Sequence, residues 1–258
     1  MLSVSFGRIS LTVALLVSAP HHGTATVPAS ERFALINLFN STNGLGWEHN
    51  NNWCEGACST SGTVRFNVVG TECSWYGVGC DVAQTHVYNL YLSRNGLSGP
   101  LPDLSQLTEL GDFEVRDNAV SGTLLPLLGL SKLGGFDGGG NQLTGQIPNL
   151  TVLPNLLNFF VDRNQLTGPM PDLSVLHLDS LDLSHNWLTG PVPALPRPRV
   201  YPPWFHICPN PLDTMPSAND AGWNTFSGFD PWWANPYPNN RCDDIFTGQF
   251  EYIPPPPV

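Results

Sequence analysis

The chain has 258 residues, a formal net charge of −11, only 12% charged residues, and 25 glycines and 25 prolines. This length fits one extended repeat domain or two small globular domains. The apolar content of 41% is too high for a disordered chain. Lys132 is the only lysine, so the sequence offers no basic stripe for binding nucleic acid or anionic membranes.

The first residues have the pattern of an export signal. Arg8 supplies a positive end, residues 9–19 form a short apolar run, and small residues follow. We therefore predict a signal peptide over residues 1–25. The apolar run is too short to span a bilayer, and no later stretch is long enough. The remaining chain is expected to be secreted and monomeric, without a membrane anchor.

Residues 26–85 are predicted to form an N-terminal cap. Residues 30–40 have the pattern of an amphipathic helix that begins at Ser30 and turns Phe33 and Phe39 inward. A stack of repeats has an open apolar end that must be covered. The tryptophans of the segment, which would provide this cover, are Trp47, Trp53 and Trp75.

All six cysteines lie after the predicted signal, where an oxidising compartment favours disulfides. The first four allow three pairings, of which we favour Cys54–Cys58 with Cys73–Cys80. A zinc site is the alternative, but the spacings differ from two matched C-x-x-C knuckles. The remaining two cysteines, which we expect to pair and close the C-terminal cap, are Cys208 and Cys242.

Residues 86–193 repeat one frame five times, L-x-x-L-x-L-x-x-N-x-L-x-G-x-L/I-P, with a period of 22 to 23 residues. The asparagines of the frame are Asn95, Asn118, Asn141, Asn164 and Asn186. A period of this length with this frame is the signature of a leucine-rich repeat solenoid. The leucines are expected to fill the interior. Each asparagine is expected to bond backbone groups of its own and the next turn, which builds a ladder.

The predicted fold is an α/β-type solenoid, a right-handed superhelix with a parallel sheet on its concave face and disulfide-stapled caps. Glycine and proline after each asparagine favour a mostly non-helical return on the convex side. Residues 138–140 are three glycines that interrupt the third repeat, which we predict to be the loosest turn.

Residues 194–252 are predicted to hold a degenerate sixth repeat around Asn210, followed by a C-terminal cap. Residues 253–258 form a proline-rich tail that should be extended. The cap contains an aromatic cluster that we expect to close the solenoid end, with sugar stacking as the alternative. Its members are Trp232, Trp233 and Tyr237.

The segment C-x-W-x-G-V-x-C at residues 73–80, followed by repeats ending in G-x-I/L-P, resembles the plant-type leucine-rich repeat family. That family includes polygalacturonase-inhibiting proteins and the ectodomains of plant receptor kinases. The resemblance covers residues 30–193. It implies a curved solenoid with a recognition role, and it does not identify a partner.

Side chains that flank the inward leucines should form one continuous concave face. The candidate ligand-binding residues are Tyr91, Arg94, Glu114, Arg116, Asp137, Phe160, Arg163 and Asp182. This acidic face suits a basic protein loop or a carbohydrate, with Tyr91 and Phe160 as stacking platforms. Exposed aromatic residues on a water-facing sheet favour binding, whereas an ordinary solvated face is the alternative.

Other functions are weighed against this one. Glu114 and Asp137 on adjacent turns would lie roughly 5 Å apart, as in a retaining glycosidase, but regular stacking gives any such pair this distance. Because no nucleophile–base set, nucleotide loop or metal cluster stands out, we expect neither an enzyme nor a cofactor or metal. The alternative is a structural protein of a cell wall or an ice-binding solenoid. Its candidate surface is the row Ser98, Ser121, Thr144, Thr167 and Thr189.

Two N-x-S/T sequons could be glycosylated in a eukaryotic secretory pathway. They begin at Asn40 and Asn149.

Overall fold

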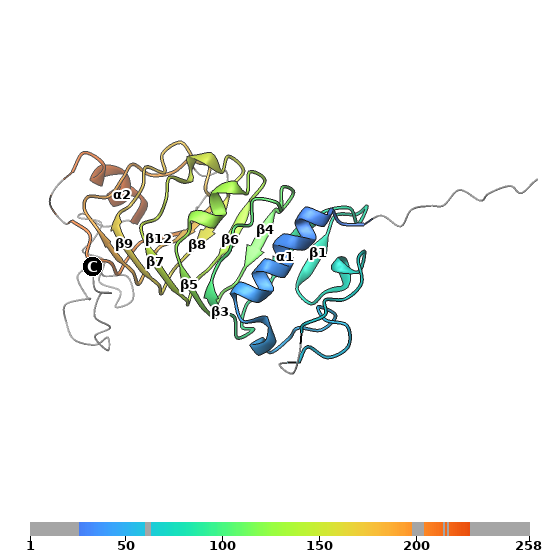
Figure 1. Ribbon diagram of the computed structural model, residues 1–258. Coiled ribbons are helices and arrows are strands. Elements are labelled where there is room, and N and C mark those ends of the chain that lie inside the picture. Colours follow the sequence, from blue (N-terminus) through green and yellow to red (C-terminus); the bar gives the residue numbers. More distant parts are fainter. Residues whose placement is uncertain (1–25, 60–62, 198–203, 214, 216, 228–258) are drawn as a thin grey trace, which may run out of the picture.

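The computed structural model describes residues 26–59, 63–197, 204–213, 215 and 217–227 (Figure 1). The predicted signal peptide, Cys242, the aromatic cluster at 232–237 and the proline-rich tail lie outside these residues. Within the described part of the chain, no helix is long and apolar enough to cross a membrane.

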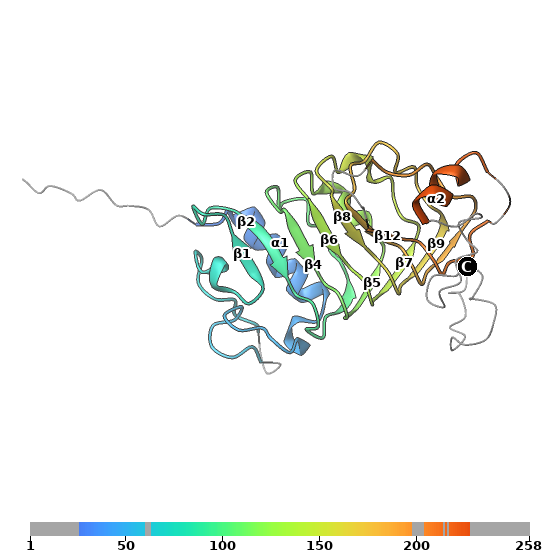
Figure 2. The same cartoon turned by 180° about the vertical axis from the view of Figure 1, so that it is seen from behind.

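The solenoid is built from two sheets, to which successive turns contribute one strand each (Figures 1 and 2). In sheet order, the seven-stranded sheet contains β1 (Val78–Cys80), β2 (Val87–Tyr91), β4 (Asp112–Glu114), β6 (Gly135–Asp137), β8 (Asn158–Phe160), β10 (Ser180–Asp182) and β12 (Trp204–His206). The five-stranded sheet contains β3 (Ser98–Pro100), β5 (Ala119–Gly122), β7 (Gln142–Gly145), β9 (Gln165–Pro169) and β11 (Trp187–Thr189).

Neighbouring strands are parallel in both sheets, except that β1 is antiparallel to β2. In the returns that the structure describes, helical structure is limited to two short 3₁₀ helices, η3 (Leu125–Gly129) and η4 (Leu150–Val152). The prediction of a leucine-rich repeat solenoid with a parallel sheet and a mostly non-helical return is confirmed. We call the water-facing side of the seven-stranded sheet the concave face.

The frame's apolar positions form the core between the two sheets. Phe113, Phe136 and Phe159 are fully or almost fully buried and stack along the solenoid, with ring centroids 5.6 and 5.9 Å apart. In the third turn, a Cβ atom added at Gly138 would lie 2.7 Å from the Phe136 ring. The ring thus occupies the space that the missing leucine would fill, so the triple glycine leaves no gap there.

The frame asparagines form a hydrogen-bonded ladder along one corner of the solenoid. Asn164 shows the pattern: its Oδ1 accepts from Leu143 N of the preceding turn at 2.9 Å. Its Nδ2 donates to the carbonyl oxygens of Gly138, Val161 and Asp162 at 2.9 to 3.1 Å. The corner backbone is buried, and these bonds supply the partners that it needs. Equivalent bonds are made by Asn118, Asn141, Asn186 and Asn210.

The ladder extends into both ends of the described solenoid. Asn95 in the first turn bonds the backbone N and O of His49 in the cap. Asn210 is fully buried and follows β12, which pairs in parallel with β10. The chain therefore makes a sixth turn with the same corner chemistry.

In the first five turns, the residue before the ladder asparagine adopts a left-handed backbone conformation. In turns one to five, φ is 53° at Arg94, 55° at Asp117, 64° at Gly140, 52° at Arg163 and 56° at His185. Only glycine adopts this conformation without a steric cost. Gly140 is thus the residue best suited to the corner, and the other four turns carry some local strain there.

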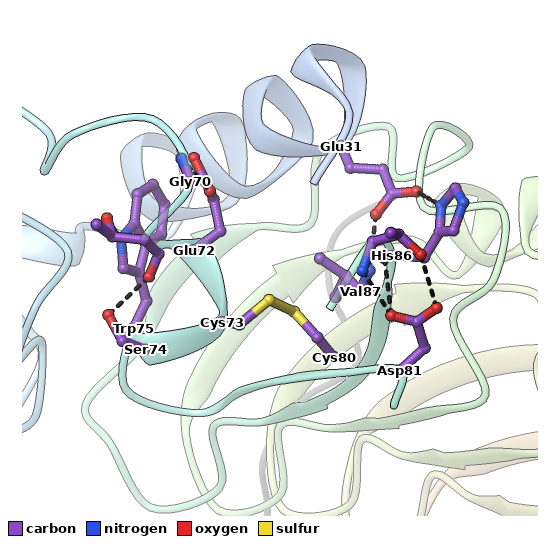
Figure 3. Close-up of a disulfide and its surroundings, with 12 residues drawn as sticks. Glu31, Gly70, Glu72, Cys73, Ser74, Trp75, Cys80, Asp81, His86 and Val87 are labelled. Carbon is purple, nitrogen blue, oxygen red and sulfur yellow. Dashed lines mark hydrogen bonds and ion pairs between the residues drawn. A yellow bond between two sulfur atoms is a disulfide. The ribbon is translucent and has the colours of Figure 1, made fainter. Parts of the chain in front are cut away.

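The N-terminal cap is centred on helix α1 (Ala29–Ser41), with the 3₁₀ helices η1 (Gly44–Gly46) and η2 (Glu72–Ser74) beside it. The N-cap is Pro28, so the prediction of Ser30 was wrong. Phe33 is 61% exposed, so its inward placement was also wrong, whereas Phe39 is buried. The helix instead buries Glu31 on its inner face, because the carboxylate accepts hydrogen bonds from the first repeat strand (Figure 3).

Aromatic rings cover the first turn as expected. The ring centroid of Phe39 lies 5.1 Å from that of Trp47 and 5.5 Å from that of Trp53. The ring centroids of Trp53 and Trp75 are 4.7 Å apart. The cap also contains two disulfides, Cys54–Cys58 and Cys73–Cys80; the second is drawn in Figure 3.

At the other end, helix α2 (Asp220–Ser227) places the buried Trp223 against the solenoid. The indole nitrogen of Trp223 donates to the Pro193 carbonyl oxygen at 2.7 Å. Cys208 is disulfide-bonded. Cys242 lies outside the described residues, so its pairing with Cys208 stays a prediction.

Candidate functional site

The concave face carries one straight column of side chains, formed by the residue after the first inward position of each strand. Register pairs Tyr91 with Glu114, Glu114 with Asp137, Asp137 with Phe160, Phe160 with Asp182, and Asp182 with His206. Five of the predicted ligand-binding residues thus share this column, and His206 extends it. Adjacent strands are about 4.8 Å apart, so the column spans roughly 24 Å.

Aromatic side chains lie toward both ends of the concave face. Tyr88 and Tyr91 of β2 are 48% and 45% exposed, and Trp204 of β12 is 45% exposed. The Trp204 ring lies 5.7 Å from the Phe160 ring in an edge-to-face arrangement and 4.2 Å from the His206 ring. Water-facing aromatic groups on both sides of a charged centre are the chief apolar feature of this surface.

An ion-paired network occupies the centre. Arg116 Nε donates to Asp137 Oδ2 at 2.8 Å, and the two terminal nitrogens donate to the Asp162 carboxylate. Asp162 is two turns away from Arg116, and the guanidinium reaches it by crossing Gly139. A Cβ atom at Gly139 would overlap both charged groups. The glycine of the third turn therefore provides the room for this bridge.

The network shapes the electrostatics of the face. Partial burial opposes the charge of Arg116, but hydrogen bonds to Asp162 and Asp137 prevail and raise the pKa of its guanidinium. Desolvation, together with the negative charges of Asp137 and Asp112, raises the pKa of Glu114. Within the described residues, neither Glu114 nor Asp112 forms an ion pair. The N-terminal half of the face therefore carries uncompensated negative charge.

Asp182 has a different environment near the C-terminal end. Its side chain is 10% exposed, and its Oδ1 accepts from Ser184 N at 3.0 Å and Ser184 Oγ at 2.6 Å. Desolvation raises the pKa of Asp182, an effect that the bonds from Ser184 and the proximity of His206 oppose. His206 Nδ1 lies 3.9 Å from Asp182 Oδ2, which is beyond hydrogen-bonding distance.

Arg94 and Arg163 lie apart from the main column. They occupy the left-handed position before the ladder asparagine, at the rim of the face. Arg94 is 79% exposed and pairs with Asp117 at 2.9 Å. The structure thus gathers six of the eight predicted residues in two adjacent columns and leaves these two arginines at the edge.

Sequence reasoning missed Trp204, His206, Tyr88 and Asp112 as members of this face. The first two flank Phe205, which fits the degenerate sixth frame, so the frame itself could have identified them. Tyr88 lies two residues before the inward Leu90, and Asp112 lies one residue before the inward Phe113; the prediction included neither position.

The Ser/Thr row considered for ice binding lies on the five-stranded sheet. Ser98 pairs with Ala119 and Ser121 with Gln142, so the row crosses the sheet diagonally and its members are not direct neighbours. The Thr144 hydroxyl donates to the Gly122 carbonyl oxygen at 3.3 Å. Within the described residues, no group of three potential metal ligands comes together.

Comparison with known proteins agrees with this geometry. A leucine-rich repeat family model matches residues 177–197, the fifth turn. The chain is similar to the ectodomain of BIR2 from Arabidopsis thaliana, at 25% identity and a TM-score of 0.55, over 75% of this chain and 99% of that one. The chain folds as a leucine-rich repeat solenoid and resembles a plant leucine-rich repeat ectodomain. This fold is typical of non-catalytic binding domains.

Two other solved structures share the fold of this leucine-rich repeat protein. One is a plant ice-binding protein, at 21% identity and a TM-score of 0.58, over 72% of this chain and 58% of that one. The other is the Arabidopsis receptor kinase HAESA, solved with the peptide hormone IDA and the co-receptor SERK1, at 22% identity and a TM-score of 0.51. The match covers 71% of this chain but only 34% of the HAESA chain.

Proposed function

We propose that this leucine-rich repeat protein is a secreted recognition protein that binds a protein or carbohydrate ligand through its concave face. The observation that carries the proposal is the in-register column from Tyr91 to His206, with exposed aromatic rings toward both ends. Regular stacking converts six turns into one continuous surface, which is the geometry that a long ligand needs.

Exposure of the aromatic rings has no explanation in the fold itself. Tyr91 and Trp204 point away from the core, which the buried leucines and phenylalanines already fill. Contiguous apolar groups rimmed by polar ones mark interaction sites. Tyrosine and tryptophan are also the residues that concentrate binding energy at interfaces.

Secretion is supported by the predicted signal over residues 1–25 and by the disulfides in the N-terminal cap, which form in oxidising compartments. Structural similarity to receptor ectodomains, one of them solved with a peptide hormone, supports a recognition role by analogy of fold.

A structural or surface-active role, such as ice binding, is the second candidate. The strands of the five-stranded sheet contain no charged residue, and the chain shares its fold with a plant ice-binding protein. The diagonal course of the Ser/Thr row gives less regular spacing than a lattice-matching surface needs, so we rank this role below recognition.

The test compares ligand capture by the mature protein and by a variant that combines Tyr91→Ala, Glu114→Ala and Phe160→Ala, with an extracellular protein extract and a glycan array as the ligand sources. A variant with Phe33→Ala and Glu55→Ala removes exposed aromatic and acidic groups from the cap, away from the face, and serves as the control. Capture lost only in the concave variant supports the proposal. Equal capture by all three proteins refutes it, and reshaped ice crystals without capture favour the second candidate.

A further inference from the structure

The C-terminal end of the concave face combines features of a sugar-binding site. Resting on the proposed function, we infer that Trp204, Phe160, Asp182 and His206 form a subsite for an uncharged hexopyranose of an oligosaccharide. Trp204 provides the stacking platform, and the carboxylate and imidazole provide the polar contacts.

The two aromatic rings come together across one intervening strand. Trp204 on β12 and Phe160 on β8 flank β10, where the residue in register with Trp204 is the small Ser180. The absence of a large side chain there lets the rings meet edge to face at 5.7 Å. The Phe160 ring supports the indole, and 45% of Trp204 stays exposed to solvent. A sugar ring presents C–H groups that pack on such an aromatic face.

The carboxylate of Asp182 is held in one orientation with one oxygen uncommitted. Oδ1 accepts both bonds from Ser184, whereas Oδ2 makes no hydrogen bond within the described residues and is 3.9 Å from His206 Nδ1. A carboxylate that is nine-tenths buried is costly unless it is satisfied by hydrogen-bond donors. A sugar hydroxyl supplies a donor for Oδ2 and can accept from the imidazole, so it complements this acid–imidazole pair.

Charge around the subsite narrows the sugar class. Asp137 and Asp162 lie on the two preceding turns, and the guanidinium of Arg116 is already bonded to both. The other guanidinium beside these turns, that of Arg163, is exposed at the rim and lies outside the two columns that contain the subsite. A polyanionic glycan would meet the carboxylate of Asp182, which pairs with no guanidinium within the described residues, so the subsite selects neutral sugars.

A basic peptide would use a different part of the face. The carboxylates without an ion pair, Asp112 and Glu114, lie beside Tyr88 and Tyr91 on the first turns. Binding of Lys or Arg side chains should therefore depend on Glu114, and binding of a neutral sugar on Trp204. The two ligand classes are distinguishable by mutation.

The test titrates cellohexaose, N-acetylated chitohexaose and hexagalacturonic acid into the full chain, with calorimetry and intrinsic tryptophan fluorescence as readouts. We expect at least one neutral hexasaccharide to bind and to change the fluorescence, and the hexagalacturonate not to bind. Trp204→Ala should raise the Kd at least tenfold, and so should the isosteric Asp182→Asn. Phe33→Ala, which removes an exposed aromatic ring from the cap and away from the face, is the matched control and should leave the Kd within twofold. Near-ultraviolet circular dichroism verifies that each variant is folded.

Binding of hexagalacturonate in preference to both neutral sugars would overturn the inference, as would neutral-sugar binding that is unchanged in a folded Trp204→Ala variant. An Arg- or Lys-rich peptide selected from a random heptapeptide library, lost with Glu114→Gln while no neutral sugar binds, would also overturn it but would leave the proposed function standing. Ligand capture that no concave substitution affects would overturn both.

Discussion

The asparagine ladder allows the most direct test of what holds the solenoid together. Asn164→Ala removes the side-chain acceptor for Leu143 N and three donations to carbonyl oxygens. One unsatisfied buried backbone donor costs about 1 to 3 kcal/mol. The carbonyls lose less, because those of Gly138 and Val161 also accept from neighbouring ladder asparagines. We expect the free energy of unfolding to fall by about 2 to 4 kcal/mol.

Urea denaturation followed by far-ultraviolet circular dichroism measures this loss. Asn155→Ala is the matched control, because Asn155 lies in the return leading into the same turn, is exposed, and makes one side-chain hydrogen bond, to Ser131 O at 2.9 Å. The control should lose about 0.5 kcal/mol or less. If Asn164→Ala proved no more destabilising than Asn155→Ala, the ladder would not be a source of stability.

Two further predictions follow from charged groups. Gly139→Ala should displace the Arg116 guanidinium and lower the free energy of unfolding by about 1 to 3 kcal/mol, because the bridge is partly buried; Gly134→Ala, where an added Cβ makes only ordinary contacts, should have a much smaller effect in thermal melts. The hydrogen bond to Glu31 raises the pKa of His86 above its usual 6.5, so its stabilising contribution is complete below about pH 6.5 and is lost as pH rises through the raised value. The difference in melting temperature between wild type and His86→Gln should therefore shrink as pH rises, and a constant difference from pH 5 to 9 would contradict this.

Much of the architecture follows from the sequence because each frame position has a local physical role. A ladder asparagine bonds groups within its own turn and the preceding one, so one frame of about 23 residues contains the information needed for the fold. Helix α1 shows where such reasoning fails. The apolar pattern placed Phe33 inside, but the inner position belongs to Glu31, whose partners His86 and Val87 are more than 50 residues away. A buried carboxylate cannot be recognised without its partners.

The concave face was predictable in its positions but not in its interactions. Alternation along each strand identifies which side chains face water, and this placed Tyr91, Glu114 and Phe160 correctly on the surface. What these side chains do depends on the occupants of the neighbouring turns. Trp204 reaches Phe160 only because the intervening strand carries a small residue in register with it.

The role of Gly139 depends on the neighbouring turns and not on its own repeat. Within its own repeat, the glycine is a departure from the frame and suggests a loose turn. Across the repeats, it stands between Arg116 and Asp162, which are 46 residues apart in sequence and bond through the space above it. Because Gly139 has no side chain, Arg116 of the second turn can bond Asp162 of the fourth turn. The central cation of the face is therefore already paired. The charge that a ligand meets is therefore decided partly by a residue that contributes none.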